Sequence, residues 1–290
     1  MTAARKLREL LASEGFLQAP GAYDGITARL IEQAGFPLVY MTGAGASAAH
    51  GYPDYGLLTL TEMADSAGRI ARTVKIPLIS DADTGYGNEL NVTRTVREFE
   101  GRGVAGIHIE DQVMPKKCGH LDGKEVIPLA EYASKIRAAA AARRDPDFVI
   151  IARTDANAVT GFEDAVARAN AGLAAGADIA FIEAPKTLEE LAAIPQRVKG
   201  PCLLNVVAGG KTPMLSSEDA AKLGYRLAIH PGACLGPVLM GLDASLAKLR
   251  GVERPAATGA VGPMELFRRF GADEWDALRR KLDAGQVAAE

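Results

Sequence analysis

Residues 111–120 of this 290-residue chain read Asp-Gln-Val-Met-Pro-Lys-Lys-Cys-Gly-His, so one short loop carries a thiol, an imidazole and two ammonium groups. Gly119 keeps the backbone beside Cys118 adjustable, and the adjacent lysines and His120 favour a thiolate by stabilising negative charge. Cys118 is therefore a candidate acid, base or nucleophile. The simpler alternative is an exposed basic loop with an incidental cysteine, and the rest of the chain has to decide between the two.

The elements that could position this loop are short apolar runs separated by segments of helical periodicity. Eight such runs predict strands, at residues 17–22, 38–42, 77–83, 106–110, 148–154, 179–183, 202–207 and 226–230. An opening helix to about Glu14 precedes them. The periodic segments predict helices at residues 25–34, 60–73, 90–101, 129–143, 162–175, 188–198 and 217–223.

Suitable N-cap residues precede several of these helices, namely Asp24, Thr59, Asn88, Thr187 and Ser216. Strands that alternate with helices pair in parallel, and eight units favour a closed (β/α)8 TIM-type barrel over residues 1–250. An open doubly wound sheet is the structural alternative, but no Gly-x-Gly-x-x-Gly turn follows the first strand.

Polar residues end nearly every predicted strand, where a barrel of this class places its chemistry. Residues two apart on a strand share a face, which pairs Asp81 with Asp83 and His108 with Glu110. Three carboxylates gathered at a barrel mouth repel one another unless a cation bridges them, and oxygen ligands suit Mg²⁺, with Mn²⁺ possible. For each carboxylate alone, a helix cap or a solvated strand end is the alternative.

Arg153 could bind a substrate carboxylate through its guanidinium fork, or it could pair with Glu183 or Asp155. His108 is either an interior hydrogen-bonded residue or a participant, and His230 is expected to be structural. Residues 43–47 form a glycine-rich turn whose backbone N–H groups could bind an anion.

Composition excludes several classes. The hydrophobic content of 48% with 24% charged residues is typical of a globular protein, and the net charge of −3 without a basic block argues against nucleic acid. No apolar run has the length of a membrane span, no signal peptide is evident, and a cytoplasmic location is expected. Three dispersed cysteines indicate no disulfide framework, and Cys202 and Cys234 are expected in the core.

The C-terminal part exceeds what one barrel needs. A last barrel helix at 233–250 is followed by a Gly/Pro/Ala-rich linker at 251–262 and by helical segments at 263–284, so that residues 251–290 form a linker and tail. The tail carries apolar side chains, including Trp275, that must be buried on the barrel or on a neighbouring subunit. We expect a neighbour, and hence a homo-oligomer.

Four motifs together resemble the isocitrate lyase and phosphoenolpyruvate mutase superfamily, in its methylisocitrate lyase, 2,3-dimethylmalate lyase and oxaloacetate hydrolase branch. They are Asp-Ala-Asp-Thr-Gly-Tyr-Gly from Asp81, His-Ile-Glu-Asp-Gln from His108, Lys-Lys-Cys-Gly-His from Lys116, and Ile-Ala-Arg-Thr-Asp-Ala from Ile151. The likeness extends over about residues 18–250.

The resemblance implies a magnesium ion held directly by Asp83 and through water by Asp81 and Glu110. It implies a substrate pocket formed by Thr42, Gly43, Ala44, Asp54, His108, Gly119, Arg153 and Asn205. The catalytic groups that it implies are Tyr40, Lys116, Cys118, His120 and Glu183. It also implies a mobile loop around Cys118 and a C-terminal barrel helix exchanged between subunits of a homotetramer, a dimer of dimers.

The implied reaction is magnesium-dependent cleavage of a carbon–carbon bond in a 2-hydroxy or hydrated 2-keto dicarboxylate, giving an α-keto acid such as pyruvate and a carboxylate. Methylisocitrate lyases have an arginine after the loop histidine, whereas this chain has Leu121. That arginine would help to bind a third carboxylate, so a substituted malate or oxaloacetate is favoured over a tricarboxylate. The segment 205–213 also resembles the dimethylmalate lyase and oxaloacetate hydrolase branch.

Four alternatives stay open: an oxaloacetate hydrolase, an oxaloacetate decarboxylase, a phosphonopyruvate or phosphoenolpyruvate mutase-type enzyme, and a non-catalytic binding barrel. The phosphonate branches generally lack the Lys-x-Cys-Gly-His loop.

Overall fold

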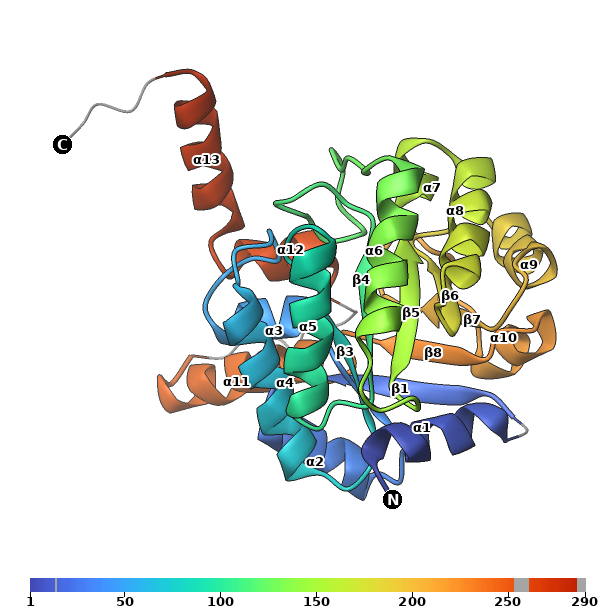
Figure 1. Ribbon diagram of the computed structural model, residues 1–290. Coiled ribbons are helices and arrows are strands. Elements are labelled where there is room, and N and C mark those ends of the chain that lie inside the picture. Colours follow the sequence, from blue (N-terminus) through green and yellow to red (C-terminus); the bar gives the residue numbers. More distant parts are fainter. Residues whose placement is uncertain (14, 253–260, 286–290) are drawn as a thin grey trace.

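Eight parallel strands close into a barrel in chain order in the computed structural model, which describes residues 1–13, 15–252 and 261–285 (Figure 1). The strands are β1 Leu17–Ala22, β2 Val39–Met41, β3 Leu78–Asp81, β4 Gly106–Glu110, β5 Val149–Thr154, β6 Ile179–Ile182, β7 Cys202–Asn205 and β8 Leu227–His230. Pairing of β1 with β8 completes the ring. The (β/α)8 prediction is confirmed, and the open sheet is wrong.

The helices lie around the barrel or cap its ends. They are α1 Ala3–Ala12, α2 Gly25–Gln33, α3 Gly43–Ala49, α4 Leu60–Thr73, α5 Glu89–Gly101, α6 Leu129–Ala142, α7 Ala156–Val159, α8 Phe162–Ala174, α9 Leu188–Arg197, α10 Ser217–Leu223, α11 Leu235–Leu249, α12 Pro263–Arg268 and α13 Ala272–Asp283. In the described parts of the chain no helix is long and apolar enough to cross a bilayer.

The period-two alternation of each strand divides its side chains between the barrel interior and the outer helices. On β5, Val149 and Ile151 belong to the interior cluster, while Ile150 and Ala152 pack with the outer layer. Leu7 of α1 joins the interior cluster, so α1 closes the amino end of the barrel. The interior is therefore filled with side chains and is not a pore.

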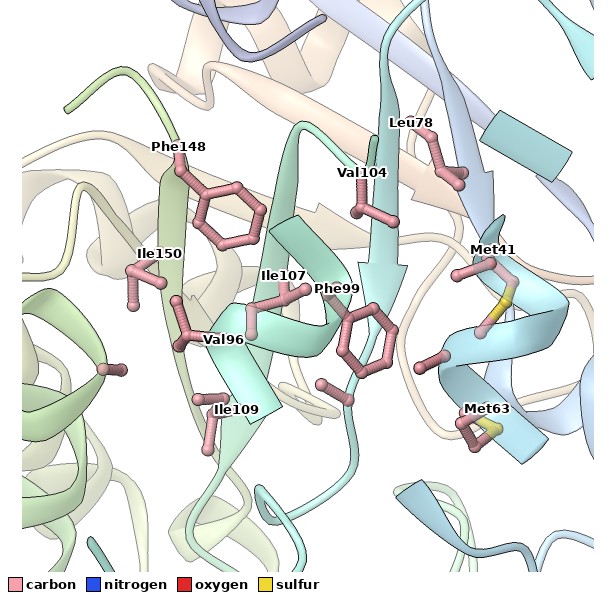
Figure 2. Close-up of a cluster of buried hydrophobic side chains, with 14 of the residues drawn as sticks. Met41, Met63, Leu78, Val96, Phe99, Val104, Ile107, Ile109, Phe148 and Ile150 are labelled. Atoms are coloured by element: carbon pink, nitrogen blue, oxygen red, sulfur yellow. The ribbon is translucent and has the colours of Figure 1, made fainter. Parts of the chain in front are cut away.

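The outer core between β3–β5 and helices α4 and α5 is shown in Figure 2, where Phe99 and Val96 face Ile107, Ile109 and Ile150. Close packing on this outer face fixes the strands, and with them the direction of the residues on the inner face.

All five predicted N-caps are confirmed. The side chains of these residues accept a backbone N–H from the first turn of the helix that follows, and they are Asp24, Thr59, Asn88, Thr187 and Ser216. Each cap satisfies a donor that the helix would otherwise leave unpaired.

Two local predictions were wrong, and one short helix was missed. The glycine-rich turn after β2 is the helix α3, and the missed helix, α7, follows β5. The third strand ends at Asp81, because Asp83 adopts a left-handed conformation with φ 45°, which is incompatible with a strand. The predicted end of the first helix at Glu14 lies outside the described residues, as does most of the predicted linker.

The C-terminal helices are sparsely buried. Along α11 only Leu235 is buried, while Leu242, Leu246 and Leu249 are 53%, 56% and 81% exposed. The α12 residues Leu266 and Phe267 pack against barrel-mouth residues of the same chain, whereas α13 extends away from the barrel (Figure 1).

Candidate active site

Inward-facing positions at the carboxyl ends of the strands carry the predicted polar residues. Alternation that places Ile107 and Ile109 in the outer core directs His108 and Glu110 inward, and Phe181 inside β6 is followed two residues later by Glu183. Strand register then sets Asp81 beside His108 and Glu110 beside Arg153. The inward-facing set at the mouth is Tyr40, Asp81, His108, Glu110, Arg153, Glu183 and Asn205.

Arg153 is the hub of this set. Its guanidinium lies 2.9 Å from Glu110 Oε2, 2.9 Å from Asp155 Oδ2 and 3.8 Å from Glu183 Oε2. Its side chain is 8% exposed, and although burial opposes the charge, the carboxylates keep its pKa well above the ordinary value. The pairing with Asp155 and Glu183 considered from the sequence is present, and the guanidinium also lines the cavity described below.

Tyr40 and His108 form a buried pair, with 2.9 Å between the hydroxyl oxygen and His108 Nε2. Burial lowers the pKa of His108 to about 4 despite the opposing charge of Asp81, so the imidazole is neutral near pH 7. Burial, followed by the charge of Asp81, raises the pKa of Tyr40 well above 10. His108 therefore acts on Tyr40 as a neutral hydrogen-bonding partner.

Lys116 extends from the β4–α6 loop, residues 111–128, into the mouth. Its Nζ lies 2.5 Å from Asp54 Oδ1 and 2.9 Å from Asp83 Oδ1. Those two carboxylates outweigh the effect of burial and keep the pKa of Lys116 well above 10.5, so it is an ammonium ion. The main chain adds a second tether, because Cys118 N donates to Asp54 O at 3.1 Å.

His120 holds the same loop on the other side of the mouth. Its Nε2 lies 3.1 Å from Glu183 Oε1, and its Nδ1 accepts Lys211 N at 3.0 Å. Asn205 Nδ2 donates to both oxygens of Glu183, at 3.2 and 3.0 Å. Burial alone would raise the pKa of Glu183, but Arg153 and His120 lower it well below the ordinary value.

Gly119 fits into the mouth without room for a side chain. A Cβ there would lie 2.4 Å from Glu183 Cγ and 2.7 Å from Arg153 Nη2. Glycine is required at this position because of this close approach, so the flexibility argued from the sequence is only part of the reason.

Cys118 differs from the sequence-based expectation of a thiolate. Burial, followed by the charge of Asp54, raises its pKa to about 12, and the lysines do not compensate because Lys116 is neutralised by two carboxylates. The thiol packs against an apolar cluster that includes Leu121, Leu235 and Phe267. Cys118 is therefore a protonated thiol near pH 7. Of the other cysteines, Cys202 is buried as expected, but Cys234 is only half-buried.

Thr42, Gly43 and Ala44 form the start of α3. The Thr42 hydroxyl accepts Gly45 N at 3.3 Å and caps the helix. A Cβ on Gly43 would lie 2.4 Å from Asp81 Oδ2, so the first turn is seated directly against the carboxylate at the end of β3.

A cavity of about 550 Å³ lies at the mouth and is lined by many, but not all, of the predicted site residues: Gly43, Asp83, His108, Glu110 and Lys116 do not line it. Its polar walls come from Thr42, Asp54, Asp81, Arg153, Glu183 and Asn205, with Cys118, Gly119 and His120 from the loop. The remaining walls are mostly apolar and include the segment after β7, α11 and α12, with Gln18 and Tyr40 as further polar residues. The volume is that of a small-molecule site with few polar groups. His230 lines it as well but makes no hydrogen bond to the described residues through Nε2.

The base of the loop is anchored by Asp111, Arg168 and Lys124, for which the sequence predicted no role. Asp111 accepts Thr154 Oγ1 at 2.6 Å and Asp155 N at 2.8 Å, and Arg168 lies 3.2 Å away. Lys124 Nζ lies 2.8 Å from Asp155 Oδ1. A charged residue in a polar loop is ordinarily exposed, so nothing in the sequence singled out Lys124.

The carboxylates of the mouth suit a hard cation. Glu110 Oε1 is buried without a hydrogen bond to the described residues, and burial raises the pKa of Asp83 to about 6 even beside Lys116. Within residues 1–13, 15–252 and 261–285, no three His, Cys, Asp or Glu side chains converge closely enough to enclose a metal by themselves. Mg²⁺ binds through one or two carboxylates and keeps several waters, so the donor set fits magnesium.

Known proteins are similar to this chain over most of its length. Residues 7–249 match the family model described as phosphoenolpyruvate phosphomutase. This chain belongs to that family. Its relatives include the 2,3-dimethylmalate lyase of Eubacterium barkeri, 50% identical over 81% of this chain and 82% of the relative. They also include the 2-methylisocitrate lyase of Aeropyrum pernix, which is 48% identical over 78% of this chain and 72% of the relative. The sequence-based expectation of a carbon–carbon lyase of this superfamily is thereby confirmed.

Solved structures extend the likeness to the whole chain. Oxaloacetate acetylhydrolase in complex with 3,3-difluorooxalacetate is 40% identical, with a TM-score of 0.84 and 99% of each chain covered. Phosphonopyruvate hydrolase, in a complex with oxalate and Mg²⁺, is 33% identical, with a TM-score of 0.78 over 97% of this chain and 99% of the other. A solved structure similar to this chain thus holds Mg²⁺ together with a small carboxylate.

Proposed function

We propose that this protein is a magnesium-dependent lyase that cleaves the C2–C3 bond of a 2-alkylmalate-type 2-hydroxy dicarboxylate, giving an α-keto acid such as pyruvate and a carboxylate. The observation that carries the proposal is the position of the Cys118 thiol on the same cavity as Arg153, Asp81 and Glu183. The names of the lyase relatives support it.

Arg153 would bind the carboxylate of the keto-acid half, together with Thr42 and the first residues of α3, Gly43 and Ala44. Asp83 would hold Mg²⁺ directly, with Asp81 and Glu110 acting through water. When bound, the cation supplies positive charge that stabilises the 2-oxygen as it becomes a carbonyl. Asp54, Lys116, His108 and Asn205 hold the loop and the mouth in place around the substrate.

The bond rearrangement balances without a redox partner. The 2-hydroxyl releases its proton to solvent, the C2–C3 electrons move to the C3 fragment as the enolate of its carboxylate, and C3 then takes a proton from a donor that solvent reprotonates. Cys118 is the donor of that proton, because a thiol with a pKa of about 12 keeps its proton at neutral pH and yields it to a stronger base. Tyr40, His120 and Glu183 surround the same space and complete the catalytic set.

The apolar environment of Cys118 supports an alkyl-substituted substrate. Leu121 is 8% exposed and packs in one cluster with Leu235, Leu266 and Phe267. A third carboxylate would have to be buried against these side chains without a partner, at a cost of several kcal/mol. A substituted malate is therefore favoured over a tricarboxylate.

The homotetramer with an exchanged α11 is part of the same proposal. The exposed leucines of α11 form a face that a single chain leaves in water, and burial of such a face between subunits would stabilise the assembly. Sedimentation velocity of the purified protein would test it, since a concentration-independent monomer contradicts it.

A substrate screen tests the activity. The protein is supplied with Mg²⁺ and offered 2,3-dimethylmalate, citramalate, methylisocitrate, oxaloacetate and phosphonopyruvate, and pyruvate, oxalate and carbon dioxide are measured. Pyruvate from an alkylmalate supports the proposal. Oxalate and acetate from oxaloacetate would replace it by a hydrolase, as in the oxaloacetate acetylhydrolase structure, and pyruvate with carbon dioxide by a decarboxylase. Excess EDTA should abolish turnover, and Mg²⁺ should restore it, with Mn²⁺ expected to substitute.

Cys118→Ser tests the proton donor. The hydroxyl is a far weaker acid, so we expect turnover to fall about 10²- to 10⁴-fold while oxalate and Mg²⁺ binding by calorimetry stays within a few-fold. Cys202→Ser is the matched control, since Cys202 is buried outside the cavity. Unchanged turnover in Cys118→Ser would remove the thiol from the mechanism.

A further inference from the structure

The β4–α6 loop reaches the mouth as a long excursion from a narrow base. An antiparallel bridge joins Gln112 to Val126, and Val113 N donates to Glu125 O at 2.9 Å. Between these points the chain forms neither helix nor strand. Its position over the mouth therefore depends on contacts made along the excursion, by side chains and by the Cys118 N–H that donates to Asp54 O.

Lys124 makes two of these contacts at once. Its side chain is 1% exposed, and its Nζ lies 2.8 Å from Asp155 Oδ1 and within hydrogen-bonding distance of the Gly119 carbonyl oxygen. One ammonium group thus joins the segment that carries Cys118 to the first residue after β5. An ammonium on a flexible stem has three donors and can satisfy a carboxylate and a carbonyl together.

Asp155 transmits this contact to the hub of the site. Arg153 Nε donates to Asp155 Oδ2 at 2.9 Å, and Arg153 Nη2 donates to Oδ1 at 3.3 Å. Oδ1 is therefore shared by the loop lysine and the guanidinium. Asp155 is fully buried, so its charge depends on both cations for compensation.

The Gly119 carbonyl is a sensitive point at which to fix the loop. Gly119 lies so close to Glu183 and Arg153 that a Cβ at this position would clash with both. Its neighbours on either side are Cys118 and His120, and His120 pairs with Glu183. A small rotation of the Gly119 peptide would move the thiol and the imidazole together.

We propose that Lys124 is a positioning residue that holds Gly119, and through it Cys118 and His120, in register with the Arg153–Asp155 pair. It touches neither the cavity nor the proposed metal ligands, and it acts by coupling the position of the loop to the direction of Arg153. The catalytic consequence rests on the proposed function above, whereas the positioning itself does not.

The test compares Lys124→Met with Lys117→Met. Both remove one ammonium group from the same loop, but Lys117 is half-exposed. The Gln112 side chain binds the backbone of Lys117, so these hydrogen bonds do not depend on the lysine side chain. Each variant is incubated with Mg²⁺, oxalate and iodoacetamide, and alkylation of Cys118, Cys202 and Cys234 is followed by mass spectrometry. Oxalate serves as the probe because it mimics a small keto-acid fragment.

We expect Cys118 of Lys124→Met to be alkylated about 10-fold faster than in the wild type, with Lys117→Met unchanged, because loss of the charged hydrogen bonds of Lys124 makes local opening of the loop more frequent. Equal rates of Cys118 alkylation in Lys124→Met and in the wild type overturn the proposal. Faster alkylation of Cys202 as well would report unfolding. If Lys124→Met unfolds, Lys124→Gln replaces it, because glutamine keeps a donor for Gly119 but loses the charge facing Asp155. Faster alkylation of Cys118 in Lys124→Gln supports the proposal, and an unchanged rate overturns it.

Kinetics add a separate readout. In Lys124→Met we expect kcat to fall about 100-fold with a smaller change in KM, since misplacement of reacting groups by about 1 Å costs that much. Lys124→Arg, which keeps the charge, should recover part of the loss. If no substrate of the screen is turned over by the wild type, the alkylation result still stands, so failure of the proposed function and failure of this inference are distinguishable.

Discussion

Arg153 at the carboxyl end of the barrel and Arg143 at the amino end both pair with carboxylates, but in opposite settings. Arg143 is 19% exposed, binds Asp178 Oδ2 at 2.9 Å and donates to the carbonyls of Ala140 and Phe148. Asp178 also forms an ion pair with Arg8 at 2.8 Å and accepts a hydrogen bond from Ile150 N at 2.8 Å. Every group in this network has partners, as expected for a structural closure of the barrel.

The hydrogen-bonding groups of the side chains at the mouth are less well satisfied. In the described parts of the chain, buried side-chain atoms that lack a hydrogen bond of good geometry lie near the carboxyl ends of strands or in the loops that follow, apart from the Tyr132 hydroxyl. They include His108 Nδ1, both oxygens of Glu110, Asn205 Oδ1 and His230 Nε2. The amino end thus stabilises the fold, while the mouth keeps polar groups available for a ligand.

The largest expected effect is that of Arg153→Lys. Lysine keeps a positive charge but cannot serve Glu110, Asp155 and a substrate carboxylate with one planar fork. We expect kcat/KM to fall roughly 10³-fold, or about 4 kcal/mol of transition-state stabilisation. Steady-state kinetics with the substrate found in the screen measures it, and a loss below tenfold would show that the fork is dispensable.

Asp111 extends the comparison to pH. Burial, followed by the charge of Asp155, raises its pKa from 3.8 to about 6. Between these values the folded state keeps a proton that the unfolded state has lost, so the contribution of Asp111 to stability falls as pH rises from about 4 to about 6. This difference in pKa corresponds to about 3 kcal/mol of unfolding free energy.

Asp111→Asn cannot titrate and should lose this dependence. Urea unfolding at pH 4.5 and at pH 7 gives the comparison. The change in unfolding free energy between these pH values should be more positive in the variant than in the wild type. An identical pH profile in both proteins would contradict the raised pKa.

Gly119→Ala is expected to cost about 100-fold in kcat, because the added methyl must displace Glu183 or Arg153 from the mouth. Thermal stability should change little, since the loop can move outward. Gly101→Ala at the end of α5, where a Cβ meets nothing within 4 Å, is the control and should retain full activity.

Arg143→Lys is the counterpart of Arg153→Lys at the other end of the barrel and should have the smallest effect. Loss of the carbonyl hydrogen bonds lowers the unfolding free energy by about 1 kcal/mol. Activity at 25 °C should not change. A tenfold loss of kcat/KM in Arg143→Lys would remove the distinction between the two ends.

The barrel was predictable from the sequence because its signals are local and repeated. Apolar runs, caps such as Asp24 and Thr59, and helical periodicity each report on a few adjacent residues. The polar strand ends could be assigned for the same reason, since alternation alone directs His108 and Glu110 to one face.

Properties that depend on several distant residues could not be predicted. The state of Cys118 is set by burial and by Asp54, and the lysine expected to lower its pKa is engaged by Asp54 and Asp83. Lys124 is buried only because Asp155 and the Gly119 carbonyl meet it from other parts of the chain. The division into a barrel over residues 1–250 and a tail, and the roles of the site residues, remain predictions.

The left-handed backbone of Asp83, with φ 45°, has a consequence for laboratory evolution. Tyr86 and Ala184, with φ 61° and 54°, share this conformation, and all three follow strands that end at the mouth. A non-glycine residue there costs about 1 kcal/mol or more, which Gly or Asn would largely recover. A library of variants selected only for heat resistance should therefore accumulate replacements at these positions, and survivors with a replacement of Asp83, a proposed magnesium ligand, would be well folded but poor catalysts.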